Sequence, residues 1–166
     1  RYIAYKEGAD KFYYYQNLFG FGRKTGIDLP GEADTSTLVY NADNYQNDVT
    51  LCTNSFGQNF NCSMIQLAAG LASLINGGHY YKPWVVKQIQ SDDGAVVEDI
   101  NKVLVRDTVS EETSRTLRNY MRSTVTSGTG RIAQIPGYTV AGKTGTAEKI
   151  PRNKEDYYIS FMAFIS

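Results

Sequence analysis

The sequence has few of the residues that bind metals or build disulfide frameworks. Its 166 residues contain one histidine, His79, and two cysteines, Cys52 and Cys62, without a C-x-x-C spacing. A structural zinc site needs four closely spaced nitrogen or sulfur ligands, so we expect no metal and no other cofactor. Free cysteine is often buried, and both thiols are therefore expected to be ordinary buried side chains. Two cysteines leave the redox compartment open.

The chain also lacks an excess of charge of either sign and a long hydrophobic run. Seventeen Lys and Arg balance seventeen Asp and Glu, so no broad electric field attracts nucleic acid or an anionic membrane. The longest apolar stretches, MIQLAAGLASLI and YYISFMAFIS, are well short of the roughly 20 residues that span a bilayer. The sequence predicts no nucleic-acid partner and no membrane contact by this segment.

The length allows one hydrophobic core but is short for two complete domains. The chain opens on Arg1 without a Met or a signal-peptide pattern. It closes at Ile165-Ser166 inside an apolar, β-like run that has no turn or cap. We therefore expect one domain, or part of one, that has been cut at both ends.

Three segments have apolar residues at helical spacing. The clearest is NCSMIQLAAGLASLINGG, where Asn61 or Ser63 can cap the start and Gly77-Gly78 ends the helix. A second helix is expected after a capping box of Thr108 and Glu111, and a third, shorter one in ADKFYYYQNLFGFG. The expected apolar faces are Met64, Leu67, Ala68, Leu71, Leu74 and Ile75 in the first, Leu117, Tyr120, Met121 and Val125 in the second, and Phe12, Tyr15, Leu18 and Phe19 in the third.

The remaining segments predict β-structure and one long connection. Residues 23 to 61 are rich in Gly, Pro, Asp and Asn without a sustained period, which is typical of an ordered surface connection. WVVKQIQ and AVVEDI flank the turn Ser91-Asp92-Asp93-Gly94, which predicts a β-hairpin. YTVAGKTGTAEKI and DYYISFMAFIS are expected to form adjacent antiparallel strands.

The segment GYTVAGKTGTAEKI matches two motifs of different chemistry. Its residues Gly137, Gly142, Lys143 and Thr144 fit the phosphate-binding pattern G-x-x-x-x-G-K-[ST]. A phosphate loop needs a buried strand before its first glycine and a helix that starts at the Lys-Thr pair, because the helix N-terminus holds the anion. Here polar GRIAQIP precedes the motif and only TAEKI follows before a proline, so the sequence argues against a nucleotide site.

The alternative is that this segment is itself a strand whose glycines leave one edge open to another backbone. A peptide can add to such an edge through main-chain hydrogen bonds. Lys143 would supply positive charge, the hydroxyls of Thr144 and Thr146 could hold a carboxylate, and the Thr146 amide could donate to an oxyanion. A regular pleat points Lys143 and Thr144 to opposite faces of the sheet. If both act on one substrate, twist of the strand or the flanking glycines must bring the two side chains together. A third interpretation is a glycine-softened turn with a solvated lysine.

Four segments in series carry a resemblance that favours the strand. The chain resembles the transpeptidase domain of class B penicillin-binding proteins, whose third active-site motif matches Lys143-Thr144-Gly145. The segments are FGFGRKTGIDLPGE at residues 19–32, SFGQNFNCSMIQLAAGLASLINGG at 55–78, SGTGRIAQIPGYTVAGKTGTAE at 127–148, and the YYISFMAFIS run.

The resemblance implies an α+β fold similar to serine β-lactamases, with an antiparallel sheet flanked by helices and the K-T-G strand along one wall of the cleft. It implies peptidoglycan cross-linking, in which a serine attacks a D-Ala-D-Ala stem peptide and the acyl-enzyme passes the acyl group to an amine; β-lactams become trapped at the same step. By the same resemblance Lys143 orients the serine of the S-x-N motif and the substrate carboxylate. Thr144, Gly145 and Thr146 are the substrate-binding residues, the two threonines through that carboxylate. The Thr146 amide completes the oxyanion hole, so Lys143 and Thr146 are the catalytic residues.

Two motifs of that family are missing from the sequence. No Ser is followed by Lys three residues later, and none by Asn two residues later, so both S-x-x-K and S-x-N are absent. By alignment, Arg1 lies just after S-x-N and Ser166 before the last strand and helix of the family. We therefore expect residues 1–166 to be a C-terminal portion of one transpeptidase domain, inactive without the nucleophile.

The resemblance also sets the expected partners and location. They are the peptidoglycan stem peptide, β-lactams and the rest of the transpeptidase domain, at the extracytoplasmic face of the bacterial membrane. A β-lactam-sensing or non-catalytic pedestal domain of the same fold is the alternative. Ser55–Gln58 is expected to build a helix entry, Ser127–Gly130 to shape the turn before the motif strand, and His79 to be a surface or core residue rather than a general base.

Overall fold

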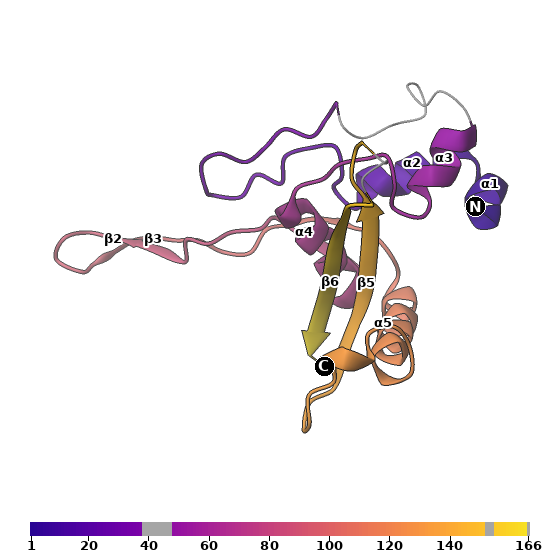
Figure 1. Cartoon of the computed structure of the whole chain (residues 1–166). Helices are drawn as coiled ribbons and strands as arrows, with labels where there is room; N and C mark the ends of the chain where they lie inside the picture. The colour runs from indigo at the N-terminus through magenta and orange to yellow at the C-terminus, as the bar shows by residue number, and fades with distance from the viewer. Residues whose placement is uncertain (38–47, 152–154, 166) are drawn as a thin grey trace.

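The computed structural model describes residues 1–37, 48–151 and 155–165. Helices and short two-stranded sheets alternate along it, and in Figure 1 helix α5 flanks the pair β5–β6 while hairpin β2–β3 extends away from the rest. The elements are α1 (Tyr2–Glu7), α2 (Ala9–Leu18), α3 (Asp48–Asn54), α4 (Met64–Ile75), β1 (His79–Tyr81), β2 (Gln88–Gln90), β3 (Val96–Asp99), β4 (Leu104–Asp107), α5 (Glu111–Thr126), η1 (Arg131–Ala133), β5 (Val140–Glu148) and β6 (Tyr157–Ile165).

The first three helices share a small core. Ala4, Tyr13 and Leu51, one from each helix, form a buried cluster. The predicted helix in ADKFYYYQNLFGFG is confirmed as α2, but its buried residues are Tyr13 and Gln16, whereas Tyr15 is exposed. The sequence did not predict α1. The prediction that residues 23–61 form one long ordered connection was partly wrong, because α3 lies within this range. Residues 38–47 of the range lie outside the described residues.

Helix α4 begins and ends as the sequence predicts but turns a different face inward. Ser63 forms a capping box with Gln66, which confirms the predicted N-terminus. The buried residues are Gln66, Gly70 and Ser73, while Met64 of the predicted apolar face is 77% exposed. A Cβ on Gly70 would stand 3.1 Å from the carbonyl oxygen of Phe19. Close backbone contact, rather than leucine packing, therefore selects the inward face.

The buried side chain of Gln66 joins three separate segments. Its Nε2 donates to the carbonyl oxygen of Arg23 at 2.5 Å and to Thr35 Oγ1 at 2.7 Å. Its Oε1 accepts from Thr35 Oγ1 at 3.1 Å and from the amide of Ser63 at 2.8 Å. Gln66 and Thr35 are both buried. The network therefore holds the two ends of the segment from Arg23 to Thr35 against α4.

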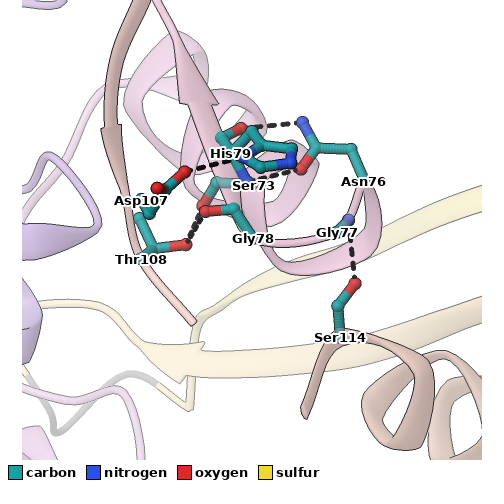
Figure 2. A network of polar contacts seen from close by, with 8 residues as sticks. All are labelled: Ser73, Asn76, Gly77, Gly78, His79, Asp107, Thr108 and Ser114. Atoms are coloured by element: carbon teal, nitrogen blue, oxygen red, sulfur yellow. Dashed lines mark hydrogen bonds and ion pairs between the residues drawn. The ribbon is translucent and has the colours of Figure 1, made fainter. Parts of the chain in front are cut away.

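Strands β1 and β4, which the sequence did not predict, pair antiparallel after α4. Figure 2 shows the polar network around them: Thr108 donates to Ser73 Oγ at 3.2 Å and to the carbonyl of Gly78 at 3.0 Å. The expected capping role of Thr108 is therefore wrong. Ser110 caps α5 instead, accepting from the amide of Thr113 at 3.2 Å, because Thr108 is committed to the α4–β1 junction.

The predicted hairpin is confirmed as β2–β3, with a register irregularity between Ile89 and Gln90. Its attachment to the body depends on Asp28. The two carboxylate oxygens accept the amides of Val85 and Val86, each at 2.8 Å. The Val86 hydrogen bond is the largest contribution that lowers the pKa of Asp28.

We predict that Gln66→Leu lowers the free energy of unfolding by about 2–3 kcal/mol. Leucine keeps the volume but leaves the carbonyl of Arg23, the amide of Ser63 and the hydroxyl of Thr35 without Gln66. Urea unfolding followed by circular dichroism measures the loss. The control Gln90→Leu changes an exposed glutamine and should move the free energy by less than about 0.5 kcal/mol. Equal stability of wild type and Gln66→Leu would contradict the proposed importance of the network.

Candidate active site on strand β5

The segment with the Lys-Thr-Gly motif is one long strand of a two-stranded antiparallel sheet. Val140 pairs with Ile165 and Glu148 with Tyr157 in one continuous register, and Thr144 lies opposite Phe161. The predicted strand pair is therefore confirmed. A phosphate loop requires a helix that starts at the Lys-Thr pair. Lys143 and Thr144 lie inside β5 and begin no helix, so the phosphate-loop interpretation is wrong. Among the described residues, β5 pairs with β6 alone, so its other edge has no strand partner.

The two glycines around Lys143-Thr144 allow β6 to approach. A Cβ on Gly142 would stand 2.6 Å from the carbonyl oxygen of Met162 and 2.7 Å from the ring of Phe161. A Cβ on Gly145 would meet the hydroxyl of Ser160 at 2.6 Å. Real Cβ atoms do not come this close, so these glycines are needed for close contact with the opposite strand.

Helix α5 packs on β5 and buries its first residues. Met121 and Val125 from the helix, and Val140 and Ala141 from the strand, are all buried. From Lys143 onward the strand is exposed or half-buried. The motif therefore begins at the point where β5 leaves the cover of α5.

The side chains of the motif alternate between the two faces of β5, and the ammonium group of Lys143 turns back toward the strand. Thr144 and Thr146 share one face of the strand, and Lys143 belongs to the other. Lys143 is exposed, and its Nζ donates to the carbonyl oxygen of Thr144 at 2.6 Å. The ammonium group of Lys143 thus folds back onto the backbone of its own strand. It lies next to Thr144, although the side chain of Thr144 points to the opposite face.

A residue that the sequence did not single out, Thr129, contacts the motif directly. Its hydroxyl lies 3.0 Å from that of Thr144. The turn prediction for Ser127–Gly130 is confirmed: the amides of Gly128 and Gly130 both donate to the carbonyl of Thr124, at 3.1 and 3.0 Å. This compact turn carries Thr129 to β5. Only the position of the turn was visible in the sequence, because the contact spans 15 residues.

A cavity of ≈ 330 Å³ lies at the C-terminal end of β5, where residues 147–150 and Tyr158 face the loop of residues 57–61. Lys149 forms an ion pair with Asp156 at 2.9 Å and lies 4.8 Å from the ring centroid of Tyr158. The hydrogen bond with Asp156 raises the pKa of Lys149. These contacts hold the ends of β5 and β6 together beside the cavity.

The other predicted positions have structural roles in the described part of the chain. Ser55 follows α3 and donates to the carbonyl of Cys52 at 2.7 Å, so residues 55–58 form a helix exit and not the expected helix entry. His79 Nδ1 lies 2.6 Å from Asp107 Oδ1 and joins β1 to β4. Cys52 and Cys62 are free and only half-buried, and burial raises the pKa of Cys62.

Across residues 1–37, 48–151 and 155–165, no group of three or more potential ligands gathers as a metal site. Within the same ranges, every helix is too short or too polar to cross a bilayer.

We predict that Gly142→Ala and Gly145→Ala differ in cost although both lie in the motif strand. At Gly142 the obstacle is the backbone of Met162, which cannot move without displacing β6, so the free energy of unfolding should fall by about 1–3 kcal/mol. At Gly145 the obstacle is a hydroxyl that can rotate away, and the loss should be smaller. Urea titration of both variants provides the comparison, and equal losses would contradict this account.

Comparison with known proteins shows the family. The family model described as penicillin binding protein transpeptidase domain matches residues 2–166. Stage V sporulation protein D of Bacillus subtilis is 36% identical over 161 residues, which cover 95% of this chain and 24% of the relative. Peptidoglycan D,D-transpeptidase MrdA of Acinetobacter baumannii is 29% identical over 153 residues, 88% of this chain and 23% of the relative. The chain thus spans about a quarter of these relatives.

A solved structure agrees over nearly the whole chain. The crystal structure of penicillin binding protein 3 from Mycobacterium tuberculosis, complexed with ampicillin, superposes with a TM-score of 0.85 at 28% identity and covers 99% of this chain and 38% of that one. The predicted α+β fold, helices with antiparallel sheet, is confirmed. Family model, relatives and fold agree with the resemblance carried by the four segments, and the chain belongs to the transpeptidase domain family of class B penicillin-binding proteins.

Proposed function

We propose that the protein containing this chain is a serine-type peptidoglycan D,D-transpeptidase that cross-links stem peptides and is acylated by β-lactams. The observation that carries the proposal is the Lys143-Thr144-Gly145 motif at the centre of β5, on a strand whose second edge has no strand partner among the described residues. The name of the relative MrdA and the ampicillin complex of the mycobacterial protein support the reaction class and the ligand class.

In this proposal the open edge of β5 receives an extended peptide through main-chain hydrogen bonds. The nucleophilic serine comes from outside residues 1–166, because the sequence has no S-x-x-K. Its Oγ attacks the D-Ala-D-Ala carbonyl, the tetrahedral oxyanion collapses, and the terminal D-Ala leaves as an amine. An acceptor amine then attacks the ester and releases the serine.

Each motif residue has a distinct role in that sequence of steps. The Lys143 ammonium supplies positive charge that orients the serine of S-x-N and attracts the substrate carboxylate. Thr144 and Thr146, on the same face of the strand, donate hydroxyl hydrogen bonds to that carboxylate. Gly145 lets β6 lie close behind the motif, because a Cβ at this position would meet the hydroxyl of Ser160 at 2.6 Å. The Thr146 amide donates to the oxyanion, a contribution of about 3–4 kcal/mol to the barrier for one such donor.

Thr129 supports this arrangement by holding Thr144. Its hydroxyl, 3.0 Å away, restricts the rotamer of Thr144. The turn that carries Thr129 is hydrogen-bonded to the end of α5, and α5 itself packs on β5. Helix, turn and strand would therefore position the hydroxyl before a substrate arrives, which lowers the cost of ordering it.

We also propose that the chain is a C-terminal portion of its transpeptidase domain and packs against the rest of that domain. Exposed apolar residues of β6, such as Ile159 at 84% and Tyr158 at 66%, support this. The proposed place of action is the extracytoplasmic face of the bacterial membrane, where peptidoglycan lies.

We predict that Lys143→Ala in the full-length protein slows covalent labelling by a fluorescent penicillin at least about 100-fold, because charge and orientation at the reacting serine are lost. Labelling rates resolved by gel fluorescence measure the effect. Lys11→Ala, an exposed lysine in α2, is the matched control and should label as wild type does. Unchanged labelling of Lys143→Ala would refute the role of Lys143. Absence of label on the wild type would favour a non-catalytic pedestal instead.

We predict that purified residues 1–166 alone acquire no covalent penicillin label, because donors without a nucleophile can bind but cannot form an ester. Intact-mass spectrometry after incubation with penicillin would detect even partial acylation. The mass of the untreated chain should remain. A stoichiometric adduct on any serine of this chain would show that the nucleophile lies within residues 1–166.

A further inference from the structure

A second cavity lies at the base of hairpin β2–β3, away from the proposed active site. It has a volume of ≈ 260 Å³, and none of the residues that line it belongs to β5, β6 or α5. In Figure 1 the hairpin extends away from the other elements. The lining includes Trp84, the one tryptophan of the sequence. The rest of its apolar lining is Val86, Ile89, Ile100 and Val103.

Backbone hydrogen bonds hold the walls of this cavity in place. The amide of Lys82 donates to the carbonyl of Val103 at 3.0 Å. The two residues that follow the tryptophan, Val85 and Val86, donate their amides to the carboxylate of Asp28, each at 2.8 Å. The cavity is therefore preformed, and a ligand that enters it pays little for ordering the protein.

The size and lining of the cavity favour one small ring. Pockets that enclose a drug-sized ligand have volumes of about 300–1,000 Å³, so a cavity of ≈ 260 Å³ suits a single ring with a short substituent. Trp84 is 41% exposed, which leaves part of its indole surface available to a ligand. The C–H face of a sugar ring packs on such a flat apolar surface, and the indole N–H can donate to a hydroxyl.

The polar groups of the cavity balance in charge and suit a neutral ligand. Asp28 is a carboxylate, because the amide of Val86 and, more weakly, the charge of Lys82 lower its pKa. Lys82 also lines the cavity and balances the charge of Asp28. Asn101 Nδ2 donates to the carbonyl of Asp99 over a long 3.4 Å, a contact that a ligand can replace. These groups offer acceptors and donors to hydroxyl and amide groups, whereas an ion meets no excess of opposite charge.

We propose that this cavity binds an N-acetylated sugar of the peptidoglycan glycan strand, with the sugar ring against Trp84 and the acetamido group between the apolar wall and Asn101. An N-acetyl sugar is neutral, has an apolar ring face, and carries a methyl group beside an amide, so it matches all three parts of the lining. The inference rests on the proposed function for the identity of the polymer. Glycan strand and stem peptide then bind at different residues of the same chain.

Co-sedimentation of the purified full-length protein with insoluble peptidoglycan tests the inference. The peptidoglycan is first stripped of its stem peptides by an amidase, so that no peptide remains for the K-T-G strand. Trp84→Ala should raise the apparent Kd at least about tenfold, and Trp84→Tyr, which keeps an aromatic face, should stay within about threefold of wild type. Asn101→Ala should weaken binding about threefold or more, because hydrogen bonds to the acetamido group are lost.

Soluble competitors identify the kind of sugar. A tetramer of N-acetylglucosamine should displace the protein from the stripped peptidoglycan. Amylose, a glucose polymer without acetamido groups, should compete at least about tenfold more weakly, because it leaves Asn101 without its partner. Equal competition by the two would overturn the assignment to an N-acetylated sugar.

The matched control is Tyr120→Ala, which removes an exposed aromatic side chain from α5 and should bind as wild type does. Circular dichroism of each variant checks that the fold is kept. A wild type that does not sediment with the stripped peptidoglycan, or a Trp84→Ala variant that binds as tightly as wild type, would overturn the inference. Penicillin labelling of the same samples separates the two proposals. A labelled wild type that binds no glycan refutes the glycan site alone, and an unlabelled wild type whose glycan binding depends on Trp84 refutes the proposed function alone.

Discussion

The ladder between β5 and β6 fixes the position of every group in the K-T-G motif. Its register runs without a bulge from Val140 to Glu148, so the alternation of side chains is uninterrupted and Thr144 and Thr146 must share a face. Gly142 and Gly145 keep the two strands close, and α5 buries the start of β5. The motif is therefore held from one edge and one face, which leaves the second edge of β5 open in the described part of the chain. In the proposed reaction that edge is where the stem peptide lies.

Local signals in the sequence predicted several elements that depend on local interactions, although the capping box expected at Thr108 was wrong because Thr108 bonds to Ser73 and Gly78. The polar cap at Asn61 or Ser63, the turn Ser91-Asp92-Asp93-Gly94 and the β-rich runs around Lys143 each specify a conformation within a few residues, and the structure has a cap at Ser63, the hairpin and the strand pair. The family resemblance added the order of the segments. It also led to the chemistry proposed for the motif, because that chemistry belongs to residue types at fixed spacing and not to the details of packing.

The features that the sequence did not reveal depend on contacts between distant segments. Helix α4 shows this best: its leucine stripe predicted an apolar inner face, yet the buried residues are Gln66, Gly70 and Ser73. Gln66 bonds to Arg23 and Thr35, and Gly70 admits the backbone of Phe19. Periodicity cannot show that polar partners lie 43 and 31 residues away. The contact between Thr129 and Thr144 was hidden for the same reason.

The apolar residues that α4 leaves half-buried or exposed bear on how the proposed active site is assembled. A helix whose polar residues are satisfied inside this chain, and whose Met64 is 77% exposed, has apolar surface still to bury, as do Ile159 and Tyr158 of β6. If the rest of the transpeptidase domain covers these surfaces, the same hydrophobic contact that stabilises the chain also brings the segment with the serine to the open side of β5. Positioning of the nucleophile would then come from packing between the two parts, and positioning of Thr144 from within this chain. The two halves of the site would be ordered by independent interactions, so a change at Thr129 should disturb substrate orientation without displacing the serine.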